Sequence, residues 1–410
     1  MENDNYLKEL FQKEFAKMVA VISSLFGLEH IELAEDLVSE TFLTAAESWG
    51  MKGMPPNPTA WLYAVAKQKT LYHFRRNKIF QQKILPALGS QKEETTEMDE
   101  LNFSDQHIKD SQLQMIFAIC TPVIASEAQI GLALRILCGF GIDEIAEAFL
   151  SNKETVNKRL FRAKEKLRIE KVQLEFPPED QISERLDNVL HIIYLLFNEG
   201  YYSMTQNEIL RRDLCAEAMR LGVFLTEYER TNLPKTNALL ALMSFHASRF
   251  NARQTREGEI ILYEDQDKGK WDTELIRQGM HFLDLSASGK ELSSYHLEAR
   301  IACWHCIKED SPEKWNEILS LYDQLLIINN SPAVVLNRLY ALYKANGIDA
   351  ALKEAEPLQM DNNHFYFILL GELYRKKDPK RALKLYQQAL PLSKTQSERQ
   401  EIQHKIDSLS

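Results

Sequence analysis

The stretch IDEIAEAFLSNKETVNKRLFRAKEKLR, residues Ile142–Arg168, decides the fold class of the region around it. This spacing of apolar residues predicts a short helix, a tight turn at Leu150–Asn152 and a longer second helix. Ser151 and Glu154 fit a capping box that would start the second helix. A short helix followed closely by a longer basic helix is typical of a helix-turn-helix. The apolar positions are Ile142, Ile145, Ala146 and Phe149 in the first helix, and Val156, Leu160, Ala163 and Leu167 in the second.

The second of these helices carries the polar side chains that could meet a nucleic acid. Its lysines and arginines can bind phosphates, while Asn157 or Arg162 can read base edges in a major groove. A solvated basic helix in a helical bundle is the alternative. The predicted exposed face holds Lys153, Glu154, Asn157, Lys158, Arg162 and Lys164, with Arg159 at its edge.

Two more helical segments precede this motif. The segment AEDLVSETFLTAAESWG (34–50) places Asp36 and Glu40 on one helical face, where they either meet a basic or polar partner or are simply solvated. The next segment begins at Asn57-Pro58, a helix-capping pair, and its part Val65–Lys83 holds six basic residues and no acid. Aromatic residues such as Tyr72 lie among these cations, a combination that suits unpaired bases, although aromatics at helical spacing also form cores.

Composition changes along the chain predict its domains. Residues 86–107 are acidic and poor in apolar side chains, which indicates a flexible linker. The pair Pro177-Pro178 marks a second boundary. We therefore expect domains at 1–85, 108–172 and 180–410. Near the C-terminus, two sets of aromatic and small residues recur with an offset of 31 residues, which favours paired-helix repeats of the tetratricopeptide kind. These sets are Tyr343, Ala351, Ala355 and Leu358, and Tyr374, Ala382, Tyr386 and Ala389.

The overall composition indicates an all-α protein. Only 15 Gly and 13 Pro occur in 410 residues, and the segment EIILY (259–263) is the one candidate for extended structure. The formal net charge of −10 argues against a nucleic-acid binder, but residues 152–171 carry eight basic and three acidic side chains. No apolar run is long enough for a membrane span, and the acidic N-terminus is unlike a signal peptide. Five cysteines suggest a reducing cytoplasm.

The sequence gives only weak signals for a metal-binding or catalytic site. Cys303-Trp304-His305-Cys306 has no second Cys-x-x-Cys to complete a zinc site, so we expect a helix packed in a core. The carboxylates of 264–267 are followed at once by Lys268 and Lys270, which favours a turn with local ion pairs. No phosphate-binding loop, nucleophile elbow or metalloprotease motif is present. We therefore expect no enzyme activity, no metal and no cofactor.

Taken together, the segments 34–50, 57–76 (NPTAWLYAVAKQKTLYHFRR) and 142–168 resemble a bacterial sigma factor of the extracytoplasmic-function group. The C-terminal half resembles the branch of that group with a long tetratricopeptide-like extension. The chain departs from the group at Ser39, at Lys67-Gln68 and at Tyr72, where Gln, Arg-Asn and Asp are usual. The segments that carry the second resemblance are YLLFNEGYYS (194–203), RRDLCAEAMRL (211–221), SRFNAR (248–253), EDQDKGKWD (264–272) and SPAVVLNRLYAL (331–342).

The resemblance implies a division of labour. The 34–50 helix would bind the β′ clamp of core RNA polymerase, the 57–76 helix with the loop 50–57 would capture a flipped base of the −10 element, and the helix-turn-helix would read the −35 element and meet the β flap. The acidic linker would lie in the RNA-exit path. The implied polymerase contacts are Asp36, Glu40, Thr41 and Phe42. The implied −10 contacts are Trp61, Lys67, Lys69, Tyr72, Arg75 and Arg76. The implied −35 contacts are Lys153, Glu154, Thr155, Asn157, Lys158, Arg159 and Arg162.

The extension leaves regulation open. Because residues 172–410 are net acidic, we expect them to contact the two basic modules within the chain and to gate them. A stand-alone helix-turn-helix regulator with a ligand- or peptide-sensing domain is the competing hypothesis, and a pure interaction scaffold is a third. The 34–76 block discriminates among them, because an ordinary repressor has no use for it.

Overall fold

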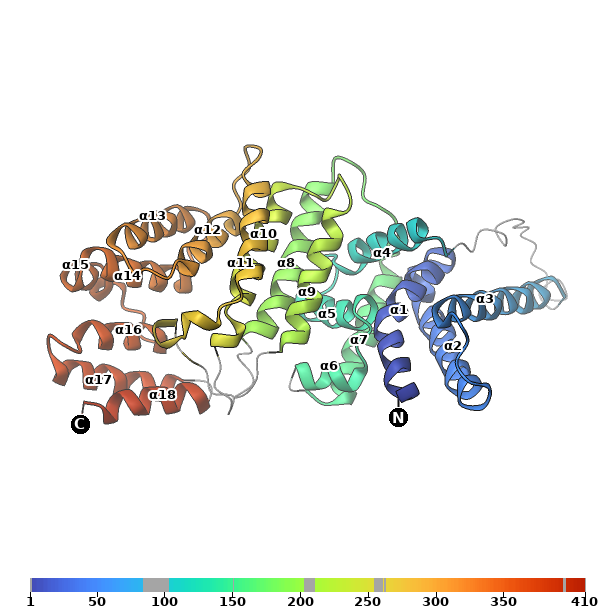
Figure 1. Cartoon of the computed structure of the whole chain (residues 1–410), viewed down its shortest axis with the longest axis horizontal. Coiled ribbons are helices and arrows are strands. Elements are labelled where there is room, and N and C mark those ends of the chain that lie inside the picture. The colour runs from blue at the N-terminus through green and yellow to red at the C-terminus, as the bar shows by residue number, and fades with distance from the viewer. Residues whose placement is uncertain are drawn as a thin grey trace. The chain divides into compact units, whose positions relative to one another are not determined.

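In the computed structural model, the described residues are 2–83, 103–149, 151–202, 211–253, 261, 263–393 and 396–409. These residues form helices, turns and loops with no strand among them, which confirms the all-α prediction. They divide into two compact units, residues 1–192 and 193–410 (Figure 1). None of the helices in the described ranges is both long and apolar enough to cross a lipid bilayer.

The first three helices of unit 1 are α1 (Glu2–Phe26), α2 (Ile31–Lys52) and α3 (Pro58–Lys83). Gly27, at a φ of 84°, ends the helical path of α1 before the 3₁₀ turn η1 (Leu28–His30). Asn57 caps α3 as predicted, because its Oδ1 accepts from the amide of Ala60 at 3.0 Å. The loop before α3 is shorter than the predicted 50–57, because α2 continues to Lys52. Gly53, whose φ is 79°, follows as its C-cap.

Helix α1 is the centre of unit 1. Residues 18–23 of this helix are all buried, which needs neighbours on every face. Helix α2 covers one side, and α4 (Asp105–Ile119) and the π-helical turn η3 (Ala133–Leu137) cover another. The N-terminal helices and the helices after residue 103 therefore share one core.

The second half of unit 1 carries the helix-turn-helix. After α4 come α5 (Ser126–Leu132), η3, α6 (Ile142–Ala148) and α7 (Lys153–Ile169). Residues 86–102 of the predicted linker lie outside the described residues, but its end at 103–107 is structured, because α4 begins at Asp105. Phe103 packs against Tyr63 with ring centroids 5.0 Å apart, and Ser104 caps α4.

Helix α8 (Ile182–Tyr202) begins in unit 1 and continues into unit 2. Unit 2 is a succession of helices that pack mainly on their neighbours in sequence. They are α9 (Arg212–Thr226), α10 (Pro234–Ala247), α11 (Thr273–Ser286), α12 (Ser294–Cys306), α13 (Pro312–Ile328), α14 (Pro332–Asn346), α15 (Ile348–Ala355), α16 (His364–Tyr374), α17 (Pro379–Ala389) and α18 (Gln396–Asp407).

Small residues allow the last helices to approach closely. Ala351, Ala382 and Ala389 are fully buried, and a Cβ on Gly371 of α16 would lie 2.4 Å from the ring of Tyr386 on α17. Helices α16 and α17 therefore pack as a close pair. The predicted extended segment 259–263 falls mostly outside the described residues, and Tyr263 begins the 3₁₀ turn η5 (Tyr263–Asp265).

Candidate nucleic-acid and polymerase interfaces

Helix α7 is built as a half-buried helix with one polar face. Its buried stripe is the predicted one, Val156, Leu160, Ala163 and Leu167. The predicted capping box is wrong by one residue: α7 begins at Lys153, and the Asn152 side chain accepts from the amide of Thr155 at 2.8 Å. Asn152 is the N-cap because its backbone is still extended, with a ψ of 155°, as an N-cap residue requires.

The structure leaves most of the predicted −35 residues on the open face of α7. Two are engaged by carboxylates: Lys153 pairs with Asp143 at 3.0 Å, and the half-buried Arg159 pairs with Glu127 at 3.3 Å. These are surface ion pairs, which cost little to exchange for phosphate. Phe161, 59% exposed on the same helix, is an apolar side chain that sequence reasoning missed. The exposed predicted residues are Lys153, Glu154, Thr155, Asn157, Lys158 and Arg162.

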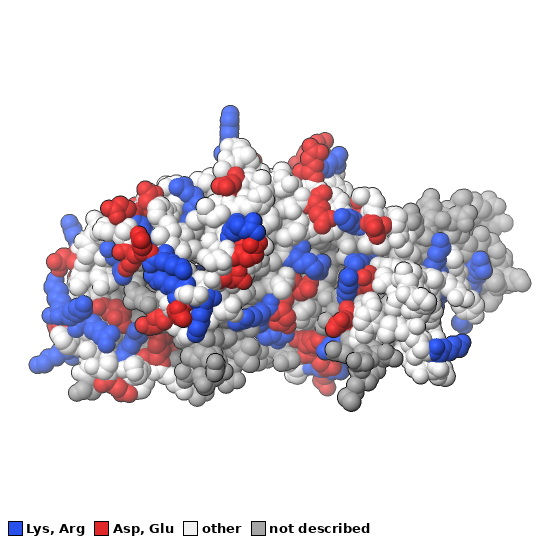
Figure 2. Space-filling view, in the orientation of Figure 1, with Lys and Arg blue, Asp and Glu red and all other residues white. Residues whose placement is uncertain are grey.

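Helix α3 presents the predicted −10 residues along its length. Tyr72 is 67% exposed, and Lys67, Arg75 and Arg76 are exposed as well. An aromatic ring projecting among cations can stack on an unpaired base while the cations hold its backbone. In Figure 2, the described surface over α2 and α3 shows isolated basic side chains among uncharged ones, whereas both signs mix over unit 2.

Other side chains of α3 face protein rather than solvent. Trp61 is half-buried against Trp49 of α2, with ring centroids 5.4 Å apart. Lys69 lies 3.4 Å from Glu40 of α2. Tyr63 donates its hydroxyl to Glu14 at 2.6 Å; burial, followed by that carboxylate, raises the pKa of the Tyr63 hydroxyl. Tyr63 is therefore a structural residue.

The predicted polymerase residues of α2 divide into two kinds. Asp36 and Glu40 are exposed one turn apart. Thr41 and Phe42 are buried. The Thr41 hydroxyl donates to the carbonyl of Leu37 at 2.8 Å, and the Phe42 ring packs 5.0 Å from that of Phe11 on α1. These two residues position the helix in this structure and offer no surface for a partner.

The same surface has exposed apolar side chains that the sequence pattern did not single out. Leu43 is 63% exposed on α2, and Met51 is 80% exposed near its end. A partner surface of exposed carboxylates beside exposed apolar groups is typical of a protein interface with a polar rim. The signal that could have found them is their place off the buried stripe of α2.

Several of the extension's motif segments meet in unit 2. The guanidinium of Arg253 lies 4.0 Å from the ring centroid of Tyr201, and Arg249 donates to the Tyr201 hydroxyl at 3.4 Å. The amide of Asp272 donates to the carbonyl of Ser248 at 2.8 Å. Burial and the nearby cations Arg249 and Lys314 lower the pKa of His305 to about 3. The imidazole of His305 is therefore neutral at pH 7.

The cysteines and carboxylates that the structure describes in unit 2 lie in a helix and a turn. Burial raises the pKa of Cys303 to about 11 and that of Cys306 in the same direction, so both are thiols at neutral pH. Both are half-buried in α12 and pack against the buried apolar cluster around Phe245, in agreement with the expected core packing. Asp267 caps a turn through the amide of Gly269, and no cluster of three potential metal ligands occurs in the ranges described.

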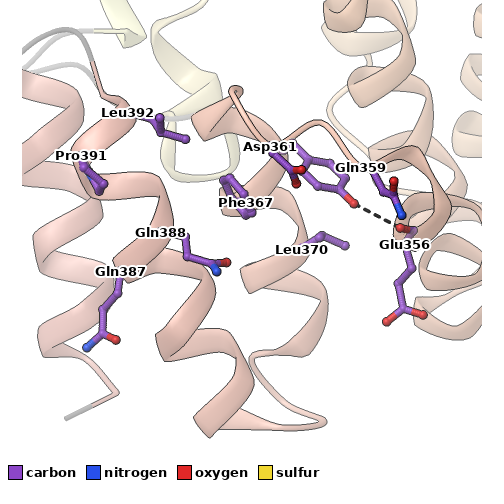
Figure 3. A pocket seen from close by; sticks show the side chains of 10 residues that line it. Glu356, Gln359, Asp361, Phe367, Leu370, Gln387, Gln388, Pro391 and Leu392 are labelled. Carbon is purple, nitrogen blue, oxygen red and sulfur yellow. Dashed lines mark hydrogen bonds between the residues drawn. The ribbon is translucent and has the colours of Figure 1, made fainter.

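An open groove of about 700 Å³ lies among the C-terminal helices (Figure 3). Its floor is apolar, with Phe367 and Leu370 from α16. Its rim is polar, with Gln387 and Gln388 from α17 and Asp361 from the preceding loop. The hydroxyl of Tyr366 on α16 donates to the carbonyls of Ala355 and Glu356 and so ties α16 to the end of α15.

Comparison with known proteins gives a consistent pattern. Residues 11–79 match the family model described as sigma-70 region 2, and residues 185–287 match a family of unknown function, DUF6596. The chain is 31% identical over 407 residues to "Uncharacterized protein R00370" of Rhizobium meliloti (strain 1021), a match that covers 96% of this chain and 94% of the relative. No solved structure matches the chain.

Proposed function

The chain belongs to the family of Rhizobium meliloti protein R00370 and is a sigma factor with a sigma-70 region 2, and from this premise we propose that it is a bacterial factor of the extracytoplasmic-function group. Sigma factors act in transcription initiation through core RNA polymerase and promoter DNA and are not enzymes. The observation that carries the finer proposal is the combination, in unit 1, of the exposed carboxylates of α2, the basic helix α3 and the helix-turn-helix α6–α7.

Each surface has its own role in this proposal. Asp36 and Glu40, with Leu43 beside them, bind the β′ clamp, and Thr41 and Phe42 hold that helix in place. Helix α7 lies in the major groove of the −35 element, where Asn157 and Arg162 reach base edges and the lysines bind phosphates. The β flap supports this second module. These events take place in the cytoplasm, where polymerase and DNA meet.

Helix α3 captures the −10 element as single strand. Its cations bind the backbone, and Tyr72 stacks on a base that leaves the duplex at a cost of about a few kcal/mol. Trp61 packs against Trp49, which supports a role as the rigid base of this surface. The loop 53–57 borders the same surface and completes the pocket for the flipped base.

The extension forms tetratricopeptide-like repeats and regulates the two modules. The close Ala and Tyr packing of α14–α17 supports the repeat assignment, and the net acidity of residues 172–410 supports a regulatory contact with basic helices. Deleting residues 193–410 tests regulation. Unchanged promoter output and unchanged polymerase affinity would contradict it.

Affinity capture with core polymerase tests the main proposal. We expect the full chain to bind core polymerase and to support run-off transcription from genomic DNA. The Arg162→Ala variant should keep polymerase binding and lose promoter output, while Lys166→Ala, further along α7, is the matched control. If duplex DNA is bound tightly and no polymerase complex forms, the chain is instead a stand-alone helix-turn-helix regulator.

A further inference from the structure

The open groove among the C-terminal helices takes no part in the proposed function. Phe367 and Leu370 of α16 form its floor and belong to a packed apolar cluster, in which they are 9% and 5% exposed. Pro391 and Leu392 add apolar surface just after α17. Because closely packed side chains keep their positions, this apolar floor is present before any partner binds.

The rim of the groove offers polar groups that the protein itself leaves unused. Asp361, Gln387 and Gln388 are exposed, and no side-chain hydrogen bond joins any of them to another residue in the ranges that the structure describes. Figure 3 shows Gln388 extending from α17 toward the side chains of α16. A side-chain amide both donates and accepts, so the two glutamines can pair with the N–H and C=O groups of an extended backbone.

The charge at the rim is negative. The described residues that line the groove include two carboxylates and no lysine, arginine or histidine. Glu356 is already compensated, because it pairs with Arg381 at 2.7 Å and accepts from the hydroxyl of Tyr374. Asp361 has no cation within ion-pair distance among the described residues. A cation on the occupant would therefore complement Asp361.

The loop that carries part of the rim is held in one shape. Gln359 has a φ of 47°, in the left-handed region that residues with a side chain adopt only uncommonly. The hydroxyl of Tyr366 donates to the carbonyls of Ala355 and Glu356 and so closes the segment 356–366 across its base. A rim that is fixed in advance loses little conformational freedom on binding.

The shape of the groove favours a chain segment over a small molecule. Its volume is about 700 Å³, but it is open to solvent. Small-molecule sites enclose most of the surface of their ligand, which an open groove does not do. A peptide segment needs an open groove, because its chain must enter at one side and leave at another.

We propose that this groove binds an extended segment of a partner protein, with one apolar side chain on the floor and one Lys or Arg at Asp361. The two glutamines of α17 hold the backbone of that segment. The inference goes beyond the proposed function and does not depend on it, because every residue involved lies in unit 2.

Peptide display on the immobilised full chain tests the groove. A library of random dodecapeptides is first depleted on the Asp361→Lys variant and then selected on the wild type. We expect the recovered peptides to share an apolar residue and a nearby Lys or Arg. Recovery of no peptide, or of peptides without a basic residue, would overturn the proposal.

Matched variants then measure the contacts with one recovered peptide, labelled with fluorescein and followed by fluorescence anisotropy. We expect Asp361→Lys to raise the Kd at least about tenfold and Gln388→Ala to raise it about threefold. Glu309→Lys makes the same charge change at an exposed site outside the groove and should stay within about twofold of the wild type. All three positions are exposed, so equal melting temperatures should confirm that the variants fold.

A charge swap separates a direct contact from a change in fold. The peptide with its basic residue replaced by Glu should bind the wild type at least about tenfold more weakly and should bind Asp361→Lys more tightly than the original peptide does. Equal Kd values for Asp361→Lys and Glu309→Lys would overturn the proposal. A wild type that sediments as a dimer, with Asp361→Lys as a monomer, would show that the groove holds a second copy of this chain and would also overturn it.

Discussion

Asn152 sets the start of the DNA-reading helix, and its loss should be measurable. Its side chain satisfies the amide of Thr155, one of the orphan donors of the first turn. We expect Asn152→Ala to lower the free energy of unfolding of unit 1 by about 1 kcal/mol, as N-cap losses do. Ser151→Ala is the control and should cost much less. Chemical denaturation of both variants checks this. Equal losses of unfolding free energy in the two variants would contradict the assignment of Asn152 as the N-cap.

His305 should make the stability of unit 2 depend on pH. Its folded-state pKa is about 3, held down by burial and by nearby cations, while an unfolded histidine titrates near 6.5. Below pH 6.5 the histidine of the unfolded chain is protonated, whereas His305 of the folded chain stays neutral down to about pH 3. The contribution of His305 to the free energy of unfolding is therefore fully present above pH 6.5 and falls by up to about 1.4 kcal/mol per pH unit below it.

The variant His305→Gln removes that titration. We expect its unfolding free energy to fall less between pH 6.5 and pH 5 than that of the wild type, by roughly 1–2 kcal/mol. His281→Gln, at an exposed site, should keep the wild-type slope. Urea unfolding followed by tryptophan fluorescence measures both, and parallel curves for His305→Gln and the wild type would contradict the assignment.

At the scale of elements, glycine reports where two helices touch. The Cβ of Gly371→Ala would lie 2.4 Å from the ring of Tyr386, which must then move. We expect a loss of about 1–3 kcal/mol, the cost of overpacking a close helix pair. Gly50→Ala in α2 has nothing within 4 Å and should instead stabilise by about 0.5–1 kcal/mol. Thermal unfolding of the two variants should move in opposite directions.

Periodicity predicted elements well where one face is buried. The stripe of α7 and the Asn57-Pro58 start of α3 were both predicted from local spacing. Helix α1 is buried more widely than a single apolar stripe predicts, because residues 18–23 are all buried. Thr41 and Phe42 were assigned to a partner surface by resemblance, and only the three-dimensional packing shows that they point inward.

The buried carboxylate of Glu35, which accepts from Arg135 and from Lys164, shows what a single sequence cannot supply. The two cations lie 100 and 129 residues from Glu35 along the chain, and each of the three looks like an ordinary charged position on a helix. Nothing in local spacing pairs them, because the pairing depends on how α1 packs against α4 and η3. By contrast, the net charge of −10 became informative once its distribution was considered, since the basic side chains concentrate on α3 and α7.

At the scale of the whole molecule, the first unit extends past the Pro177-Pro178 boundary. Arg185 of α8 donates to the carbonyl of Phe117 at 3.1 Å, and Asn188 donates to the carbonyl of Cys120 and to the side chain of Gln129. Leu186 and Val189 are fully buried. The first turns of α8 therefore belong to the helix-turn-helix unit, although the proline pair looks like a domain end in sequence.

This shared helix predicts the outcome of truncation. A fragment of residues 1–179 loses the α8 side chains that cover α4 and α5, so it should unfold at a lower temperature than a fragment of residues 1–192, by several degrees. The pair Arg185→Ala and Asn188→Ala in the longer fragment should reproduce part of that loss, because each leaves buried carbonyls without a donor. Asp187→Ala, exposed between them, is the control. Equal melting temperatures for the two fragments would show that α8 adds nothing to unit 1.

The comparison also fixes how the regulatory role of the extension must be tested, since only a cut after residue 192 removes the extension without also weakening the DNA-reading module.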